Sequence, residues 1–356
     1  MTLTRTIRAR RAAVCFVATG LVSALAAGCS SSDDGITLGK DWKGARSFVV
    51  VDISGTEAVA GVNPVTRKAE PLVLVPQHDD DDDALAPQLA RLSDGQWVLA
   101  VPRKDGRPDR FYRLDEGSHK LVEQGDHEAL HAILPGRTLV ADAKGLGGSQ
   151  AGSGTGTDVL VKDPKSWSVK RKVHLSGPLL DASSDPKSDT VCLATGSGKD
   201  VTIHALELGS GKLTSRPGPK GVNVQGLACS DGTPVAAGVP AAQPDGRKPN
   251  TSIAKIAVTD AGVSITADTG RIDDTQAQDG TAAVAVALGE RTEIVEVDTR
   301  NGKELRRVNL THTPALRALR NTNTGWLAYT QDAVSVVDAK TGKAQTFSLP
   351  GTYIAG

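Results

Sequence analysis

The chain has 356 residues, and its 41 Lys and Arg side chains equal its 41 Asp and Glu side chains in number. Without a net charge to attract phosphates, we expect no nucleic-acid partner. Aromatic residues make up 3% of the chain, too few for a surface that stacks sugars or bases. The 39% of apolar and 23% of charged residues are typical of a folded globular protein.

The first segment, residues 1–28, has the pattern of a secretory signal peptide. Four arginines and no acid stand in residues 1–11, an apolar stretch covers residues 12–27, and small residues precede Cys29. The apolar stretch is shorter than the roughly 20 residues that a membrane-spanning helix needs. We therefore expect residues 1–28 to be cleaved from the mature protein.

The end of this segment, Leu25-Ala26-Ala27-Gly28-Cys29, resembles the lipobox of bacterial lipoproteins. The resemblance implies that Cys29 becomes the first mature residue and carries the lipid, since in that family the cysteine thiol is diacylated. Two or more acyl chains give stable membrane attachment. We expect the lipid to anchor the protein on the extracytoplasmic face of the cell membrane, and residues 29–41 to form a flexible polar tether. The alternative is an ordinary signal peptide with a cysteine near its end.

From residue 42 to residue 356 the chain repeats an alternating strand, an Asp, a short turn ending in Gly-Lys, and a second strand. The clearest copies are residues 295–303 and 336–343. An Asp side chain bonds to the backbone two residues on, and Gly supplies a positive φ, so this pattern favours hairpins. Together with weaker copies, such as those at residues 62–68 and 163–169, seven turns follow one another about every 46 residues, within the range of a four-stranded propeller blade. No long stretch has helical periodicity.

These repeats resemble the bacterial β-propellers of the WD40-like and quinoprotein-like group. The resemblance implies an all-β domain over residues 42–356, a β-propeller with seven four-stranded blades, or else six or eight. Quinoprotein repeats carry a Trp shortly after Thr-Gly-Lys, where this chain has Leu305 and Phe347, so we expect no quinone cofactor. The first repeat starts at Arg46 without an inner strand. Residues 351–355 are predicted to supply that strand and close the ring.

The cysteines agree with export from the cytoplasm. Once Cys15 is removed with the signal peptide and Cys29 is lipidated, only Cys192 and Cys229 remain. In an oxidising compartment these two can form one disulfide. The alternative is a pair of buried thiols that pack as small apolar groups.

One motif has the spacing of a zinc-protease helix, His127-Glu128-Ala129-Leu130-His131. The Pro135-Gly136 pair leaves little room for a helix, and the segment aligns with the first strand of a blade. In a strand, the two histidines face one side and the glutamate faces the other. We expect a strand, in which His127 and His131 remain candidate metal ligands.

A second metal candidate is the run of five aspartates, residues 79–83, that follows His78. Calcium takes six to eight oxygen ligands, and the candidate ligands here are His78, Asp79, Asp81 and Asp83. The run lacks the alternating spacing of a dedicated calcium loop, so the preferred interpretation is a solvated acidic loop.

Two long loops are predicted, a glycine-rich one at residues 144–157 and another at residues 240–250. Loops on one face of a propeller are the usual place for binding. We find no complete catalytic set and expect no obligatory cofactor. The sequence therefore predicts a binding or scaffold protein with a protein or small-ligand partner. The alternative is a metal-dependent propeller hydrolase with its site in the central channel.

Overall fold

The computed structural model describes residues 35–76, 86–92, 95–103, 109–127, 132–134, 139–142, 156–163, 166, 168–184, 188–197, 200–241, 253–259, 262–267, 271–289, 291–311, 316–322, 325–338 and 340–356. Within these ranges the regular structure is all strand. Among them there is no helix with the length and apolarity that crossing a membrane requires.

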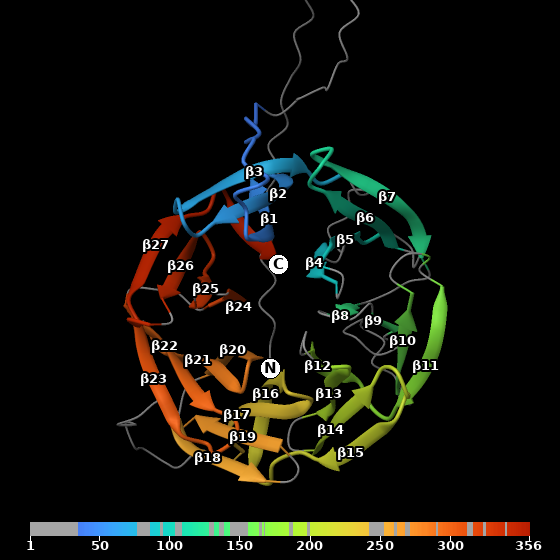
Figure 1. Ribbon diagram of the computed structural model, residues 1–356, viewed down its shortest axis with the longest axis vertical. Coiled ribbons are helices and arrows are strands. Elements are labelled where there is room, and N and C mark those ends of the chain that lie inside the picture. Colours follow the sequence, from blue (N-terminus) through green and yellow to red (C-terminus); the bar gives the residue numbers. More distant parts are fainter. Residues whose placement is uncertain are drawn as a thin grey trace, which may run out of the picture. The chain divides into compact units, whose positions relative to one another are not determined.

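Residues Thr37–Gly356 form one compact unit, in which seven four-stranded sheets surround a common centre (Figure 1). The sheets are numbered here as blades 1 to 7 in chain order. Blade 1 contains β1 (Ser47–Ile53), β2 (Thr56–Asn63), β3 (Lys68–Leu74) and β28 (Thr352–Ala355). Blade 2 contains β4 (Gln88–Arg91), β5 (Trp97–Val101), β6 (Asp109–Asp115) and β7 (Lys120–His127). Blade 3 contains β8 (Ala132–Leu134), β9 (Leu139–Asp142), β10 (Thr157–Lys162) and β11 (Val169–Leu175).

The remaining four blades follow in chain order. Blade 4 contains β12 (Leu179–Ser184), β13 (Thr190–Ser197), β14 (Asp200–Glu207) and β15 (Leu213–Pro217). Blade 5 contains β16 (Val222–Ser230), β17 (Thr233–Pro240), β18 (Ile253–Thr259) and β19 (Gly262–Ala267). Blade 6 contains β20 (Arg271–Gln278), β21 (Thr281–Leu288), β22 (Arg291–Asp298) and β23 (Glu304–Thr311). Blade 7 contains β24 (Ala318–Thr322), β25 (Gly325–Tyr329), β26 (Ala333–Asp338) and β27 (Ala344–Ser348).

The predicted all-β propeller with seven four-stranded blades is thus confirmed. Each of the seven turns joins the two outermost strands of its blade. In blade 6, Asp298 accepts a hydrogen bond from the Arg300 backbone N–H, and Gly302 has a φ of 71°. In blade 7, Asp338 accepts from the backbone of Thr341, and Gly342 has a φ of 67°. Local turn chemistry therefore places the hairpins.

The ring closes through the end of the chain, as predicted. β28 pairs antiparallel with β1 as the innermost strand of blade 1, with Val51 opposite Tyr353 and Asp52 opposite Thr352. Blade 1 therefore combines one strand from the end of the domain with three from its beginning. Closure of this kind leaves no blade without its neighbour.

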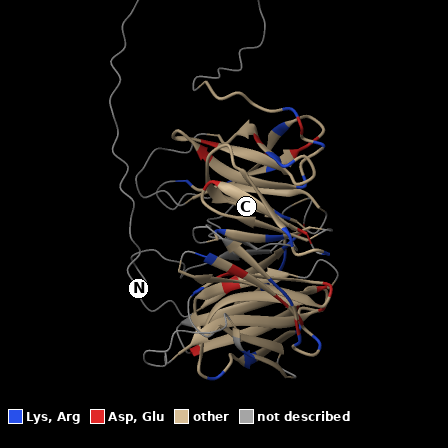
Figure 2. Ribbon diagram, turned by 90° about the vertical axis from the view of Figure 1, so that its left-hand side faces the viewer, with Lys and Arg blue, Asp and Glu red and all other residues tan. Residues whose placement is uncertain are grey.

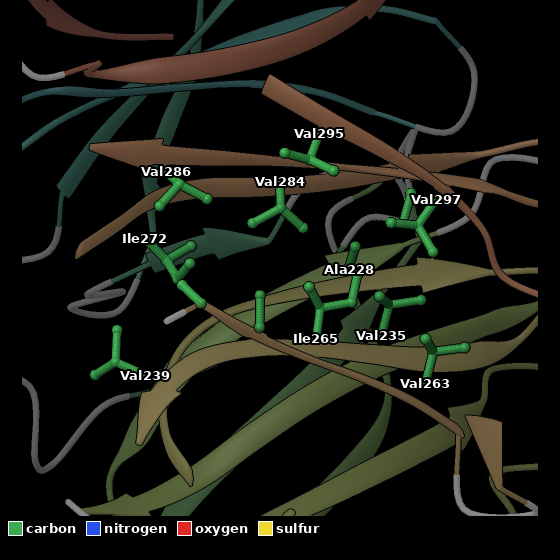
Figure 3. Packing of buried hydrophobic residues seen from close by; sticks show 13 residues of the cluster. Ala228, Val235, Val239, Val263, Ile265, Ile272, Val284, Val286, Val295 and Val297 are labelled. Carbon is green, nitrogen blue, oxygen red and sulfur yellow. The ribbon is translucent and has the colours of Figure 1, made fainter. Parts of the chain in front are cut away.

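Apolar side chains fill the spaces between neighbouring blades. Seven clusters of buried residues each span one blade boundary, including that between blades 7 and 1. Figure 3 shows the cluster between blades 5 and 6, where Val235 and Ile265 face Val284 and Val295. β21, which is rich in small apolar residues, is the second strand of its blade, since β20 lies inside it.

Blade 5 departs from the simple order of the other blades. Its strands lie in the order β16-β17-β19-β18, so β19 is inserted between β17 and β18. As a result β17 and β19 are parallel, with Val235 opposite Val263 and Gly238 opposite Thr266. Most of the predicted long loop at residues 240–250 lies outside the described residues, in the part of the chain between β17 and β18.

Contacts with blade 1 begin ahead of the predicted boundary at residue 42. The Gly39 N–H donates to the Pro71 carbonyl over 2.7 Å, and the Asp41 N–H donates to the Glu70 carboxylate over 2.9 Å. Trp42 is buried and stacks on the His119 ring with centroids 5.4 Å apart. The last residues of the predicted 29–41 tether therefore pack on the propeller.

Charged residues of both signs are interspersed over the blades in the side view (Figure 2). This agrees with equal numbers of acidic and basic side chains in the sequence.

Candidate functional site

The centre of the ring contains a cavity of about 680 Å³, bordered by β4, β12, β16, β20, β24 and β28. Its wall is mainly polar. The charged and amide side chains that line it are Arg46, Gln88, Arg91, Asp181, Gln225, Asp273, Asp274, Gln276, Arg317, Arg320 and Asn321. Because these residues come from several blades, the cavity exists only when the ring is assembled.

Three consecutive inner strands carry a β-bulge at the cavity wall. The pairing register shifts at Leu180 in β12, at Gln225 in β16 and at Asp273 in β20. A bulge inserts one unpaired residue and turns the neighbouring side chains. The bulges thus place polar side chains of β12, β16 and β20 beside the cavity and close to the next blade.

These side chains bond to the backbone of the following blade. Asp181 Oδ2 accepts a hydrogen bond of 2.7 Å from the Leu227 N–H, which joins blades 4 and 5. Gln225 Oε1 accepts one of 2.8 Å from the Ile272 N–H, which joins blades 5 and 6. Side chains that line the cavity therefore also join neighbouring blades.

Similar polar contacts join blade 6 to blade 7 and blade 7 to blade 1. Asp274 Oδ2 accepts a hydrogen bond of 2.6 Å from the Leu319 N–H, and Arg320 lies 3.4 Å from the same oxygen. The neighbouring Asp273 accepts a hydrogen bond from the N–H of Leu316, which lies just before β24 of blade 7. Arg320 also donates to the carbonyl of Gly356, next to β28. Four successive blade boundaries are thus joined by polar side chains.

Burial changes the titration of the two central carboxyls. It raises the pKa of Asp181 to about 7, and the negative charge of Asp274 adds to the rise. Burial also raises the pKa of Asp274, against the opposing effect of the Arg320 cation. At neutral pH the Asp181 carboxyl is therefore partly protonated.

Three arginines at the cavity have a different environment. Arg46, Arg91 and Arg317 are exposed and line the cavity. Arg91 donates to the Gly95 carbonyl over 3.3 Å. Within the described part of the chain, none of the three has an acidic partner. The carboxylates of the wall are bonded to backbone N–H groups, and two of them also pair with Arg271 and Arg320, whereas no described acid pairs with these three cations.

Of the sequence-predicted metal ligands, the structure describes His127 alone. His127 is the last residue of β7, the outer strand of blade 2, and not part of a first strand as predicted, while residues 128–131 of its motif lie outside the described residues. His78, Asp79, Asp81, Asp83, His131 and the lipidation candidate Cys29 lie outside the described residues. Within the described residues, no group of three His, Cys, Asp or Glu side chains is arranged to hold a metal ion.

The two mature cysteines meet at the boundary between blades 4 and 5. Cys192 lies in β13 and Cys229 in β16, both fully buried, and they are joined as a disulfide with their Cα atoms 5.5 Å apart. This bond ties the same two blades that the Asp181 hydrogen bond joins. It lies within the apolar cluster between the blades.

Sequence reasoning did not identify the channel residues. Asp181 and Asp274 stand two repeat lengths apart, each in an inner strand and followed by a small or β-branched residue. The recurrence of an acidic residue at one position of the inner strands was the sequence signal that could have indicated these channel residues. It was not readable without the strand register, because a bulge shifts the side chains of the strand.

No protein-family model matches the sequence, and no curated protein is similar to it. The acylaminoacyl peptidase of Pyrococcus horikoshii has a similar structure, with a TM-score of 0.50 and 9% identity over 84% of this chain and 49% of that chain. This chain therefore spans about half the length of that peptidase. TolB from Acinetobacter baumannii gives a TM-score of 0.47 and 10% identity, over 87% of this chain and 66% of that one.

The WD40 domain of Neurospora crassa Pan2 is also similar, with a TM-score of 0.49 and 14% identity over 79% of this chain and 85% of that chain. At identities this low, the likeness concerns the fold and not the activity. With seven four-stranded blades closed by its last strand, the domain is a β-propeller.

Proposed function

We propose that the mature chain is a lipid-anchored, extracytoplasmic β-propeller that binds a partner at the open centre of its ring. The observation that carries the proposal is the polar cavity of about 680 Å³ at this centre. Its volume is within the range of ligand sites, and its wall brings together several hydrogen-bonding side chains. The carboxylates there serve to join blades, which favours binding over metal-dependent hydrolysis.

The proposed location rests on the sequence and on the disulfide. The lipobox-like ending at Cys29 supports membrane attachment. The disulfide between Cys192 and Cys229 supports folding in an oxidising compartment, because such bonds are rare in reducing cytosol.

Fractionation of a bacterial host that produces the full chain tests the anchor. The protein is expected in the membrane fraction, accessible to added protease in spheroplasts, with a diacylated Cys29 at the N-terminus of its mature peptide in mass spectra. The variant Cys29→Ala should lose the lipid and leave the membrane, while Cys15→Ala, altered within the removed segment, should behave like the wild type. An unmodified Cys29 in the mature wild-type protein would contradict the proposed anchor.

Cross-linking in the same cells tests binding at the centre. Leu180 lines the cavity and is 44% exposed, so a photoreactive residue there reports an occupant whatever its charge. The matched control is a photoreactive residue at Val65, which is exposed in the outer β2–β3 turn. A cross-link specific to position 180 is expected. A stoichiometric divalent ion with hydrolytic activity lost in EDTA would favour the hydrolase instead.

A further inference from the structure

The exposed arginines of the channel have fixed positions along its axis. Arg91 pairs with Trp97 in blade 2, and Asn321 pairs with Trp326 in blade 7. The two tryptophans begin or nearly begin equivalent second strands, so Arg91 and Asn321 occupy equivalent inner positions. Arg317 precedes Asn321 by four residues, which is about 13 Å along a strand. Arg91 and Arg317 therefore lie toward opposite ends of the channel.

A third arginine lies at the Arg91 end. Arg46 immediately precedes β1, and β1 begins where the adjacent inner strand β28 ends. Its backbone is fixed by a hydrogen bond of 2.8 Å from its N–H to the Val62 carbonyl. Figure 1 shows β1, β4 and β24 around the centre of the ring. One end of the channel thus carries Arg46 and Arg91, and the other carries Arg317.

The three carboxylates of the wall are bonded to other groups, and Asp273 accepts from the Leu316 N–H and pairs with Arg271. Both oxygens of Asp181 accept backbone N–H groups, those of Leu227 and Ala182. Asp274 is bonded to the Leu319 N–H and paired with Arg320. The raised pKa of Asp181 further reduces the negative charge of the cavity near neutral pH. The wall therefore presents positive charge at both ends and hydrogen-bonding groups between them.

We propose that the channel binds an extended acidic peptide segment of a partner protein, with its carboxylates held by Arg46 and Arg91 at one end and by Arg317 at the other. A guanidinium matches a carboxylate with two parallel hydrogen bonds, which gives both strength and orientation. About 13 Å between the ends corresponds to four residues of extended chain. A single small anion cannot contact both ends at once. This inference rests on the proposed binding at the centre of the ring.

Binding of three probes to the mature protein, purified from membranes in detergent, tests this inference. The probes are a hexaglutamate peptide, citrate and inorganic phosphate, measured by titration calorimetry at low salt. We expect the peptide to bind and its affinity to fall as salt is added. Each of Arg91→Gln and Arg317→Gln should weaken peptide binding about tenfold, the usual effect of losing a hydrogen bond to a charged group. Arg67→Gln, at an exposed arginine in the outer β2–β3 turn, is the matched control and should change nothing.

The possible results separate the inference from the proposed function. Peptide binding that is unaffected by both channel substitutions would overturn the inference. Citrate or phosphate binding as tightly as the peptide would overturn the extended ligand. If none of the probes binds but the photoreactive residue at position 180 captures a partner in cells, the acidic peptide is wrong while binding at the centre stands.

Discussion

Removal of the disulfide between blades 4 and 5 is expected to destabilise the propeller substantially. Cys192 and Cys229 are separated by 37 residues in the sequence. In the chain-entropy description, closing a loop of this length lowers the entropy of the unfolded chain enough to stabilise the folded state by about 4 kcal/mol. For a domain of about 320 residues, this corresponds to a fall of roughly 6 °C in melting temperature. The double variant Cys192→Ala/Cys229→Ala should therefore melt at a lower temperature.

The assay is urea unfolding and thermal melting of the wild type and the double variant, each with and without a thiol reductant. Both sulfurs are fully buried, so the truncated side chains also lose some packing. Reductant present during unfolding should lower the wild-type midpoint toward that of the variant and leave the variant unchanged. Equal midpoints for oxidised wild type and variant, or two free thiols titrated in the unfolded wild type without reductant, would refute the reasoning.

Three further predictions concern the ring and its channel. Deletion of residues 351–356 removes β28 and should lower the free energy of unfolding by about 5 kcal/mol, through the loss of half-buried Tyr353 and Ile354 and of the hydrogen bonds to β1. An unchanged melting temperature would argue against closure of the ring by this strand. Because folding raises the pKa of Asp181 to about 7, its ionisation opposes folding, and the free energy of unfolding should fall between pH 4 and 7. The stability of Asp181→Asn relative to wild type should therefore increase by about 3 kcal/mol as the pH rises from 5 to 8. A difference in urea unfolding that does not change with pH would contradict this. Glu296 accepts a hydrogen bond from the Trp326 indole N–H and pairs with Arg306. Glu296→Ala should therefore lower the free energy of unfolding in urea by about 3 kcal/mol, and Glu296→Gln by less, since its amide oxygen still accepts the hydrogen bond. Equal losses for the two variants would count against the Trp326 hydrogen bond.

The number of blades was predictable because its signals are local. The turns of blades 6 and 7 combine a side-chain hydrogen bond within three residues with a glycine of positive φ, as at Asp338 and Gly342. Such chemistry can be read from a short window of sequence. The closing strand was predictable as well, since the first repeat begins at Arg46 without an inner strand and an unpaired strand-like segment ends the chain.

The channel and the order of strands in blade 5 depend on contacts far apart in sequence. The partner of Asp181 is the backbone of Leu227, 46 residues away, and no local pattern marks that hydrogen bond. The three inner-strand bulges change which side chains face the cavity, and alternation alone does not reveal a bulge. In blade 5, β18 and β19 have ordinary strand patterns, and only the pairing of β19 with β17 decides which of them lies outside.

The inserted strand of blade 5 constrains the order in which the chain can assemble. β19 cannot add to β17 by a simple turn, since the two are parallel and β18 lies between them in sequence. The local hairpin of β18 and β19 is expected to form early and then to dock as one piece, because pairing across a longer chain segment costs more loop-closure entropy. During synthesis, blade 5 therefore remains a two-stranded sheet with an open edge at β17 until residue 267 has emerged, whereas each neighbouring blade can grow strand by strand.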